Sequence, residues 1–129
     1  MAHVTVICEH KFAQQIVAGH HRWTADEPTA AGGSDTGPTP YELLLGSLGA
    51  CTAMTLRAFA LRSEWEIGKI TVGLRLTRGP GGIERIERRL SFGKPLSDAQ
   101  RARLLEIAES TPVTQALMRG VEIRSSIVD

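Results

Sequence analysis

Residues 32–55 read GGSDTGPTPYELLLGSLGACTAMT, a loop rich in glycine and proline that leads into a long apolar segment. Thr39 is a typical N-cap residue, and Pro40 suits the first turn of a helix, where its missing N–H costs no hydrogen bond. Glu42 lies in the same turn and interacts favourably with the helix dipole. We therefore expect a helix over residues 40–62.

This helix has no polar face from Leu43 to Leu48 and beyond, so it requires burial on all sides. One chain of 129 residues can hardly enclose such a helix, whereas two chains can. Gly46 and Gly49 lower the intrinsic helix propensity, and we interpret them as positions where another backbone packs closely. The pattern therefore predicts a homodimer.

The composition is 42% hydrophobic, 22% charged and 5% aromatic, which is typical of a globular protein with an aliphatic core. The formal net charge of +1 does not favour binding to nucleic acid or to a membrane surface. The sequence begins without the basic stub and apolar run of a signal peptide, and its apolar run at 43–54 is shorter than a membrane span. We expect one domain, residues 1–129, in the cytoplasm.

Three short segments before the helix are predicted to be strands, and the first of them alternates apolar and polar residues. They are Val4–Cys8, Phe12–Ala18 and His20–Thr24. The connections between them are too short for crossovers, so the strands are predicted to form an antiparallel meander.

A hairpin is predicted after the helix, because alternating segments at Ile70–Thr77 and Ile83–Phe92 flank the turn sequence GPGG. In the second segment Ile86, Leu90 and Phe92 share one side. The charged residues between 84 and 89 are interpreted as a solvated strand face with cross-strand charge pairs.

The last third of the chain predicts two helices and a strand. Ser97 and Gln100 form a capping-box pattern before a helix whose buried stripe would be Leu104, Leu105, Ile107 and Ala108. Thr111–Pro112 opens a short helix that ends before Gly120, and residues 121–128 alternate as a strand. The order of elements predicts an α+β fold.

The two cysteines, Cys8 and Cys51, are far apart and fit neither a disulfide framework nor a metal motif. Reduced thiols are typical of the cytoplasm, and we expect no metal ion or cofactor. Cys8, in an apolar strand, is interpreted as a small core residue. Cys51 is either a core residue or a redox nucleophile. Its neighbours on the helix are neutral, so a lowered pKa would require a cation from elsewhere.

Residues 32–33 (GG), 37–44 (GPTPYELL), 49–54 (GACTAM) and 111–117 (TPVTQAL) resemble the OsmC-like proteins. This family includes osmotically inducible protein C and the organic hydroperoxide resistance proteins, and the resemblance extends over essentially the whole chain. It implies an α+β fold in which two chains intertwine, with antiparallel sheets wrapped around central helices. It also implies a bacterial protein of the oxidative stress response.

In active members of this family, a peroxidatic Cys on the central helix attacks a hydroperoxide, and a resolving Cys then forms a disulfide with it. An Arg and a Glu hold the peroxidatic thiolate ready. The resemblance assigns Cys51 to the peroxidatic position and Thr111 to the resolving position, so the second thiol is replaced. Glu42, one residue beyond the family's Glu, and Arg22, the first arginine of the chain, are the candidates for the other two roles.

Two functions follow from these observations. One is a thiol peroxidase that reduces organic hydroperoxides through Cys51 and is resolved by an external thiol. The other is a non-catalytic relative that binds a small hydrophobic ligand at the dimer interface. Met54 and Phe59 are interpreted as core or dimer contacts, and alternatively as the lining of an apolar pocket for a lipid-like peroxide.

Overall fold

The computed structural model describes residues 1–129, which divide into two compact units, Met1–Gly46 and Ser47–Asp129. Helix α1 (Pro40–Ser63) begins in the first unit and continues through the second. The predicted α+β class is confirmed by three α-helices and two small antiparallel sheets. The single domain expected over residues 1–129 stays a prediction.

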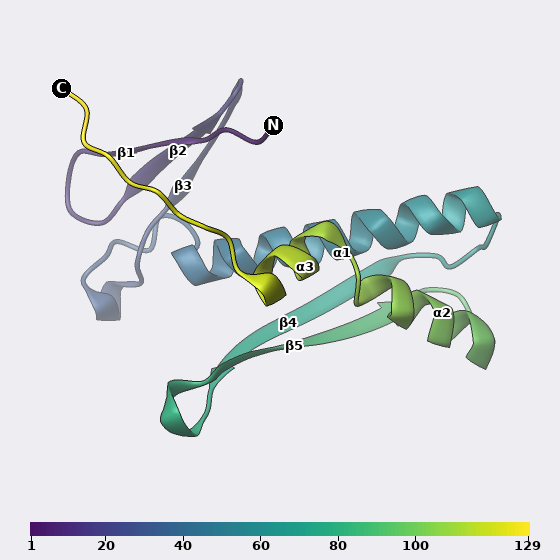
Figure 1. Ribbon diagram of the computed structural model, residues 1–129. Helices are drawn as coiled ribbons and strands as arrows, with labels where there is room; N and C mark the ends of the chain where they lie inside the picture. Colours follow the sequence, from purple (N-terminus) through teal and green to yellow (C-terminus); the bar gives the residue numbers. More distant parts are fainter. The chain divides into compact units, whose positions relative to one another are not determined.

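The first unit contains the predicted antiparallel meander (Figure 1). Its strands are β1 (Thr5–Cys8), β2 (Gln14–Ala18) and β3 (His21–Ala25). Ile16 pairs with Val6 on one side and Trp23 on the other, and of these three side chains only Ile16 is buried. The sheet therefore leaves much of its apolar surface uncovered within its own unit.

A loop with the short helix η1 (Thr29–Ala31) follows the sheet and is organised around Asp26. The Asp26 carboxylate is buried and accepts hydrogen bonds from the backbone N–H of Glu27, Ser34 and Thr36, and from the Thr36 hydroxyl at 2.6 Å. These bonds, the one from the Thr36 hydroxyl foremost, hold the pKa of Asp26 below its usual value, although burial acts in the opposite direction.

Helix α1 begins as the sequence predicts. The Thr39 hydroxyl accepts a hydrogen bond from the Glu42 N–H at 3.2 Å, and Glu42 Oε1 accepts one from the Thr39 N–H at 2.9 Å. This reciprocal pair satisfies two backbone donors that would otherwise lack partners at the helix start.

The second unit contains the predicted hairpin of β4 (Ile70–Arg78) and β5 (Glu84–Phe92), joined through the short helix η2 (Pro80–Gly82). Ile70 pairs with Phe92 at one end of the hairpin and Arg78 with Glu84 at the other. Gly81 and Gly82 have φ angles of 75° and 78°, which only glycine adopts readily, so this turn requires glycine at both positions.

Two further helices complete the second unit, as predicted. Helix α2 (Asp98–Ala108) starts with the expected capping box between Ser97 and Gln100. Helix α3 (Pro112–Arg119) has Thr111 as its N-cap and ends before Gly120. Figure 1 shows both helices and the hairpin gathered along α1.

The core of the second unit lies between α1, the hairpin and α2. Leu56, Ala60, Ile67 and Leu104 are fully or almost fully buried there. The partly buried side chains packed against them are Phe59, Trp65, Ile70, Leu90, Phe92, Leu96 and Ile107. Phe59 is thus a core residue, as expected, whereas Leu105 is 54% exposed and does not belong to the buried stripe predicted for α2.

The interpretation of Gly49 is corrected by its surroundings. A Cβ atom at Gly49 would lie 2.7 Å from Cδ1 of Leu74, so Gly49 packs against a side chain of β4 rather than against another backbone. Gly46 has open space around it, so the close packing expected there from a second chain stays a prediction.

Helix α1 is long and apolar enough to cross a membrane by length and composition, because it extends well beyond the apolar run at 43–54. Its buried residues Leu48, Thr52, Leu56 and Ala60 recur every fourth position and form one stripe. Because this stripe enters the core shared with the hairpin and α2, we describe α1 as a core helix of the second unit.

The strand predicted at residues 121–128 is wrong, because no regular structure follows α3. Ile123 is 85% exposed and Ile127 is 99% exposed. The sequence alternates as a strand does, but no neighbouring strand of this chain supplies the hydrogen bonds that a strand requires.

Candidate functional site

Cys51 lies in the middle of α1 as a free, half-buried thiol. The helix continues to Ser63 past the thiol, and the Cys51 carbonyl oxygen accepts a hydrogen bond from the Thr55 hydroxyl at 2.8 Å. Met54, one turn further along the same face, is 71% exposed. The thiol therefore lies at the border between the core of the second unit and the uncovered side of α1.

Thr111 is fully buried at the start of α3. Its Oγ1 accepts a hydrogen bond from the Thr114 N–H at 3.4 Å and lies 2.6 Å from the Thr114 Oγ1. The hydroxyl thus caps α3 and is engaged with a second buried hydroxyl.

Arg88 connects these two parts of the unit, and sequence reasoning missed it. From β5 its Nη1 donates to Thr52 Oγ1 at 3.0 Å and to Thr114 Oγ1 at 2.8 Å, while Nη2 donates to the Ala108 carbonyl at 2.8 Å. One guanidinium therefore binds α1 at the residue after Cys51, α3 in its first turn, and the last residue of α2.

Every polar side chain in this cluster has its partners. The Thr52 hydroxyl donates to the Leu48 carbonyl at 2.7 Å while it accepts from Arg88. The Thr114 hydroxyl accepts from Arg88 and also lies 3.3 Å from the Ala108 carbonyl, to which it can donate. No buried side-chain nitrogen or oxygen is left without a hydrogen bond. Such complete satisfaction is what makes a buried polar network stabilising.

The charge of Arg88 is balanced without a carboxylate, since no ion pair involves it. Its acceptors are two hydroxyl groups and the carbonyl at the C-terminus of α2, which carries the negative end of a helix dipole. The interpretation of residues 84–89 as a fully solvated face is therefore wrong for Arg88. It is right for Glu84, whose carboxylate pairs across the hairpin with Arg78 at 3.0 Å.

The alternation of residues in β5 already places Arg88 on the inward side of the strand. Residues 86, 88, 90 and 92 alternate with the others, so Arg88 lies on the same side of β5 as Ile86, Leu90 and Phe92 and is half-buried with them. A basic residue at an inward position of a strand indicates either a functional group or a polar network.

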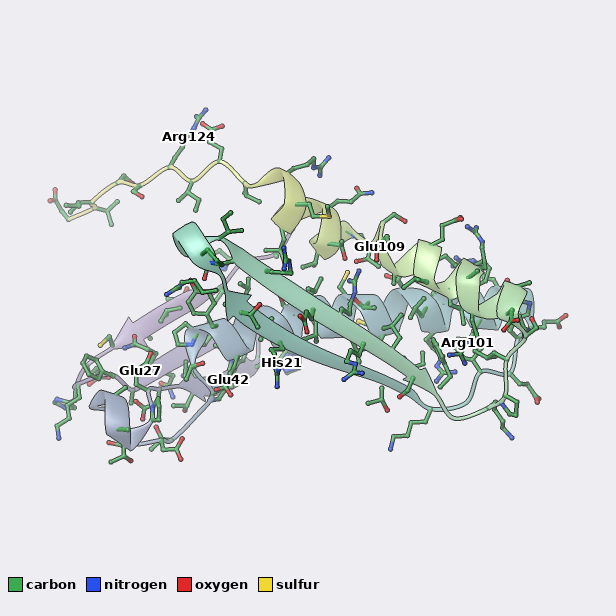
Figure 2. All side chains as sticks on the ribbon, turned by 90° about the horizontal axis from the view of Figure 1, so that it is seen from below. His21, Glu27, Glu42, Arg101, Glu109 and Arg124 are labelled. Carbon is green, nitrogen blue, oxygen red and sulfur yellow. The ribbon has the colours of Figure 1, made fainter.

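The other predicted site residues lie in the first unit. Arg22 is exposed, and its Nη1 is 3.5 Å from Gln15 Oε1, a long contact. Glu42, labelled in Figure 2 in the first turn of α1, is exposed and engaged in the capping box. Cys8 is exposed rather than a core residue, and its thiol lies 3.5 Å from the Lys11 carbonyl, to which it donates.

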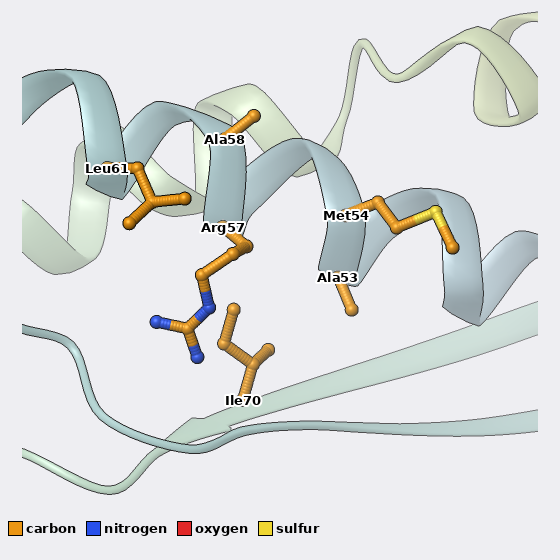
Figure 3. Close-up of a pocket in the computed structure, with 6 residues that line it drawn as sticks. All are labelled: Ala53, Met54, Arg57, Ala58, Leu61 and Ile70. Atoms are coloured by element: carbon orange, nitrogen blue, oxygen red, sulfur yellow. The ribbon is translucent and has the colours of Figure 1, made fainter.

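An open groove of about 460 Å³ runs along α1 on the side of β4 (Figure 3). Its lining consists of Ala53, Met54, Arg57, Ala58, Leu61 and Ile70. Arg57 donates through Nη2 to the Gly68 carbonyl at 2.6 Å, so its charged end is occupied, and the remainder of the lining is apolar. Met54, which Figure 3 shows lying along the helix, brings the groove to within one turn of Cys51.

Residues 32–126 match the family model described as OsmC-like protein. Comparison with the curated proteins found no match. Solved structures share the fold. The OsmC-like protein from Mycoplasma pneumoniae is 17% identical, with a TM-score of 0.79 over 92% of this chain and 87% of that chain.

Two solved organic hydroperoxide resistance proteins are also similar. The OhrB protein of Bacillus subtilis is 26% identical, with a TM-score of 0.61 over 90% of this chain and 89% of that chain. The protein from Legionella pneumophila is 16% identical, with a TM-score of 0.65 over 91% of this chain and 88% of that chain. The fold is thus shared over nearly the full length of each chain.

Proposed function

Because the chain belongs to the OsmC-like protein family, we propose that it is a thiol-dependent hydroperoxide reductase whose nucleophile is Cys51. The observation that carries this proposal is a free thiol at the border of the core, beside a polar cluster that links its helix to Thr111. Two structural relatives are named organic hydroperoxide resistance proteins, which favours an organic hydroperoxide as the substrate.

The proposed reaction begins with the Cys51 thiolate. The sulfur attacks the terminal oxygen of ROOH, the O–O bond breaks, and a proton completes the alcohol ROH. Cys51 is left as a sulfenic acid, so the sulfur is oxidised by two electrons and the peroxide is reduced by two. A reductant must then supply two electrons to restore the thiol.

That reductant has to come from outside the chain. Thr111, at the position of the family's resolving residue, offers a hydroxyl that is already engaged with Thr114 and cannot form a disulfide. An external thiol attacks the sulfenic sulfur and releases water, and a second thiol displaces Cys51 from the mixed disulfide. The protein therefore requires a monothiol in excess or a dithiol.

Arg22 and Glu42 are the proposed partners of the thiolate. Cys51 is in mid-helix and gains little from the helix dipole, so its thiolate requires a cation from elsewhere. The positive charge of a guanidinium near the sulfur would favour the thiolate. The contact from Arg22 to Gln15 is long, at 3.5 Å, so it holds the guanidinium only weakly. Glu42 would have to leave its cap on Thr39 to orient the arginine, a change that costs about 1 kcal/mol.

The test is consumption of tert-butyl hydroperoxide in the presence of dithiothreitol. Cys51→Ser should reduce the rate to that without protein, because the nucleophile is lost. Cys8→Ser is the matched control and should keep full activity, since Cys8 lies in the first unit. Trapping of the oxidised protein with dimedone should label Cys51 in the Cys8→Ser variant. Equal consumption by Cys51→Ser would rule out the proposal.

The second candidate is a non-catalytic protein that binds a small hydrophobic ligand, and the apolar groove on α1 favours it. It becomes the better description if stoichiometric peroxide leaves Cys51 reduced in folded protein. In that case, binding of a fluorescent fatty-acid probe should be weakened by Leu61→Lys, which places a charge in the groove, and unchanged by Leu105→Lys on α2.

We also propose that the protein is a cytoplasmic homodimer. Met54 and Leu61 on α1 are each 71% exposed, and the apolar residues of the segment 121–128 are uncovered as well. A second copy would cover these apolar surfaces and supply the segment with a strand to pair with. Sedimentation at micromolar concentration should give twice the mass of one chain, and Met54→Lys should shift the protein toward the monomer.

A further inference from the structure

The hydrogen bonds of Arg88 form a continuous path between the residue next to Cys51 and the start of α3. Thr52 follows Cys51 directly and accepts from Nη1, which also donates to Thr114. The Thr114 hydroxyl lies 2.6 Å from that of Thr111. Thr52, Thr111 and Thr114 are all buried, so water does not compete for these bonds.

We propose that Arg88 is a positioning residue, which holds residue 111 against the turn of α1 that carries Cys51. The proposal rests on the function proposed above, in which Cys51 reacts beside a fixed α3. Arg88 reaches Thr52, the residue next to Cys51, so the proposal predicts that a thiol introduced at residue 111 would lie within reach of Cys51.

The geometry favours this role for Arg88 over that of a general packing residue. A planar guanidinium with fixed donor directions can hold three elements at defined angles, which a lysine ammonium cannot do. The three acceptors belong to α1, α2 and α3, and they are separated from Arg88 by 36, 20 and 26 residues. No other side chain hydrogen-bonds to all three helices.

The test measures the effective concentration of two thiols and needs no peroxidase activity. In a Cys8→Ser, Thr111→Cys protein the only pair within one chain is Cys51 and the introduced thiol, and non-reducing electrophoresis separates it from disulfides between chains. Equilibration with oxidised and reduced dithiothreitol transfers two electrons and two protons between this pair and the reagent. Mass spectrometry after alkylation gives the fraction of disulfide, and from it the effective concentration.

With Arg88 present we expect the disulfide to form readily. Arg88→Met in this background should lower the effective concentration at least tenfold. Arg88→Lys in its place should lower it less, because one donor can still reach an acceptor. Two controls should leave it unchanged. Arg89→Met changes the exposed neighbour on the other strand face, and Ile67→Val lowers stability within the core without touching the network.

Two outcomes would overturn the proposal. One is an unchanged effective concentration in Arg88→Met protein that is folded by circular dichroism. The other is a failure of the disulfide to form with Arg88 present, which would mean that residue 111 is not held beside Cys51. Loss of peroxide consumption in Cys51→Ser would be unaffected by either result, so the proposed function is tested separately.

Discussion

Asp26 in the first unit and Arg88 in the second are both charged side chains at least partly removed from solvent, but the partners that stabilise them differ in their distance along the chain. Each is a charged side chain drawn toward the interior and stabilised by neutral hydrogen-bonding groups instead of an opposite charge. The partners of Asp26 lie within 10 residues of it, whereas those of Arg88 lie 20 to 36 residues away. A charge with local partners fixes the shape of one loop, and a charge with distant partners fixes the arrangement of helices.

The largest effect is expected when the distant network is removed. Arg88→Ala loses three charge-assisted hydrogen bonds, and it should lower the free energy of unfolding by about 2–4 kcal/mol. Urea unfolding at fixed protein concentration measures this change. Arg89→Ala should cost less than about 0.5 kcal/mol. Equal costs for the two variants would show that Arg88 behaves as a surface residue.

A smaller effect is expected at the edge of the same network. Thr111→Val removes the N-cap of α3 and should lower the free energy of unfolding by about 1–2 kcal/mol, whereas Thr111→Ser keeps the hydroxyl and most of the stability. In the Arg88→Ala background the cost of Thr111→Val should differ by at least about 0.5 kcal/mol. Strict additivity would mean that the cap and the guanidinium act independently.

For Asp26 the expected effect is local and depends on pH. Its pKa is lowered in the folded protein, so its contribution to stability is complete above the unfolded value near 4 and is lost as the pH falls through the lower folded value. Asp26→Asn should accelerate hydrogen exchange at Ser34 and Thr36 at pH 6, with little change in the second unit. This difference from the parent should shrink below about pH 4.

Asp35→Asn is the control for this prediction, because Asp35 is exposed in the same loop. A change in exchange that spreads through α2 and α3 would contradict the local role assigned to Asp26.

The smallest effect is expected at the surface pair of Arg78 and Glu84, whose side chains are 63% and 39% exposed. Glu84→Gln should cost less than about 0.5 kcal/mol, because solvent and salt screen the pair. The loss should disappear at high salt, and unfolding curves at low and high ionic strength measure it. A cost similar to that of Arg88→Ala would remove the distinction between exposed and partly buried charges.

The distinction between local and distant partners also explains which elements could be predicted from the sequence. The starts of α1, α2 and α3 and the GPGG turn depend on neighbours within a few residues, and all were predicted. Arg88 was misjudged because its partners lie on three other elements that no local pattern identifies. The segment 121–128 was misjudged because alternation shows the capacity to form a strand, while a strand also requires a neighbour.

In the candidate site, too, the features set by local sequence were predicted and those set by distant contacts were not. Cys51 was placed correctly in the middle of a helix, and Thr111 was placed at the start of another, because both positions follow from local signals. That Thr111 is fully buried and joined to Arg88 could not be inferred, since burial depends on the packing of distant elements.

The exposure of Met54 has a consequence for the working life of the protein. Under the function proposed above, a hydroperoxide that reaches Cys51 also meets the Met54 thioether, which lies one turn away and is 71% exposed. Oxidation to the sulfoxide would turn an apolar contact into a polar one and weaken the surface that a second copy is proposed to cover. Unassembled chains would then be oxidised at Met54 faster than assembled ones, so the proposed association would protect the protein against the proposed substrate.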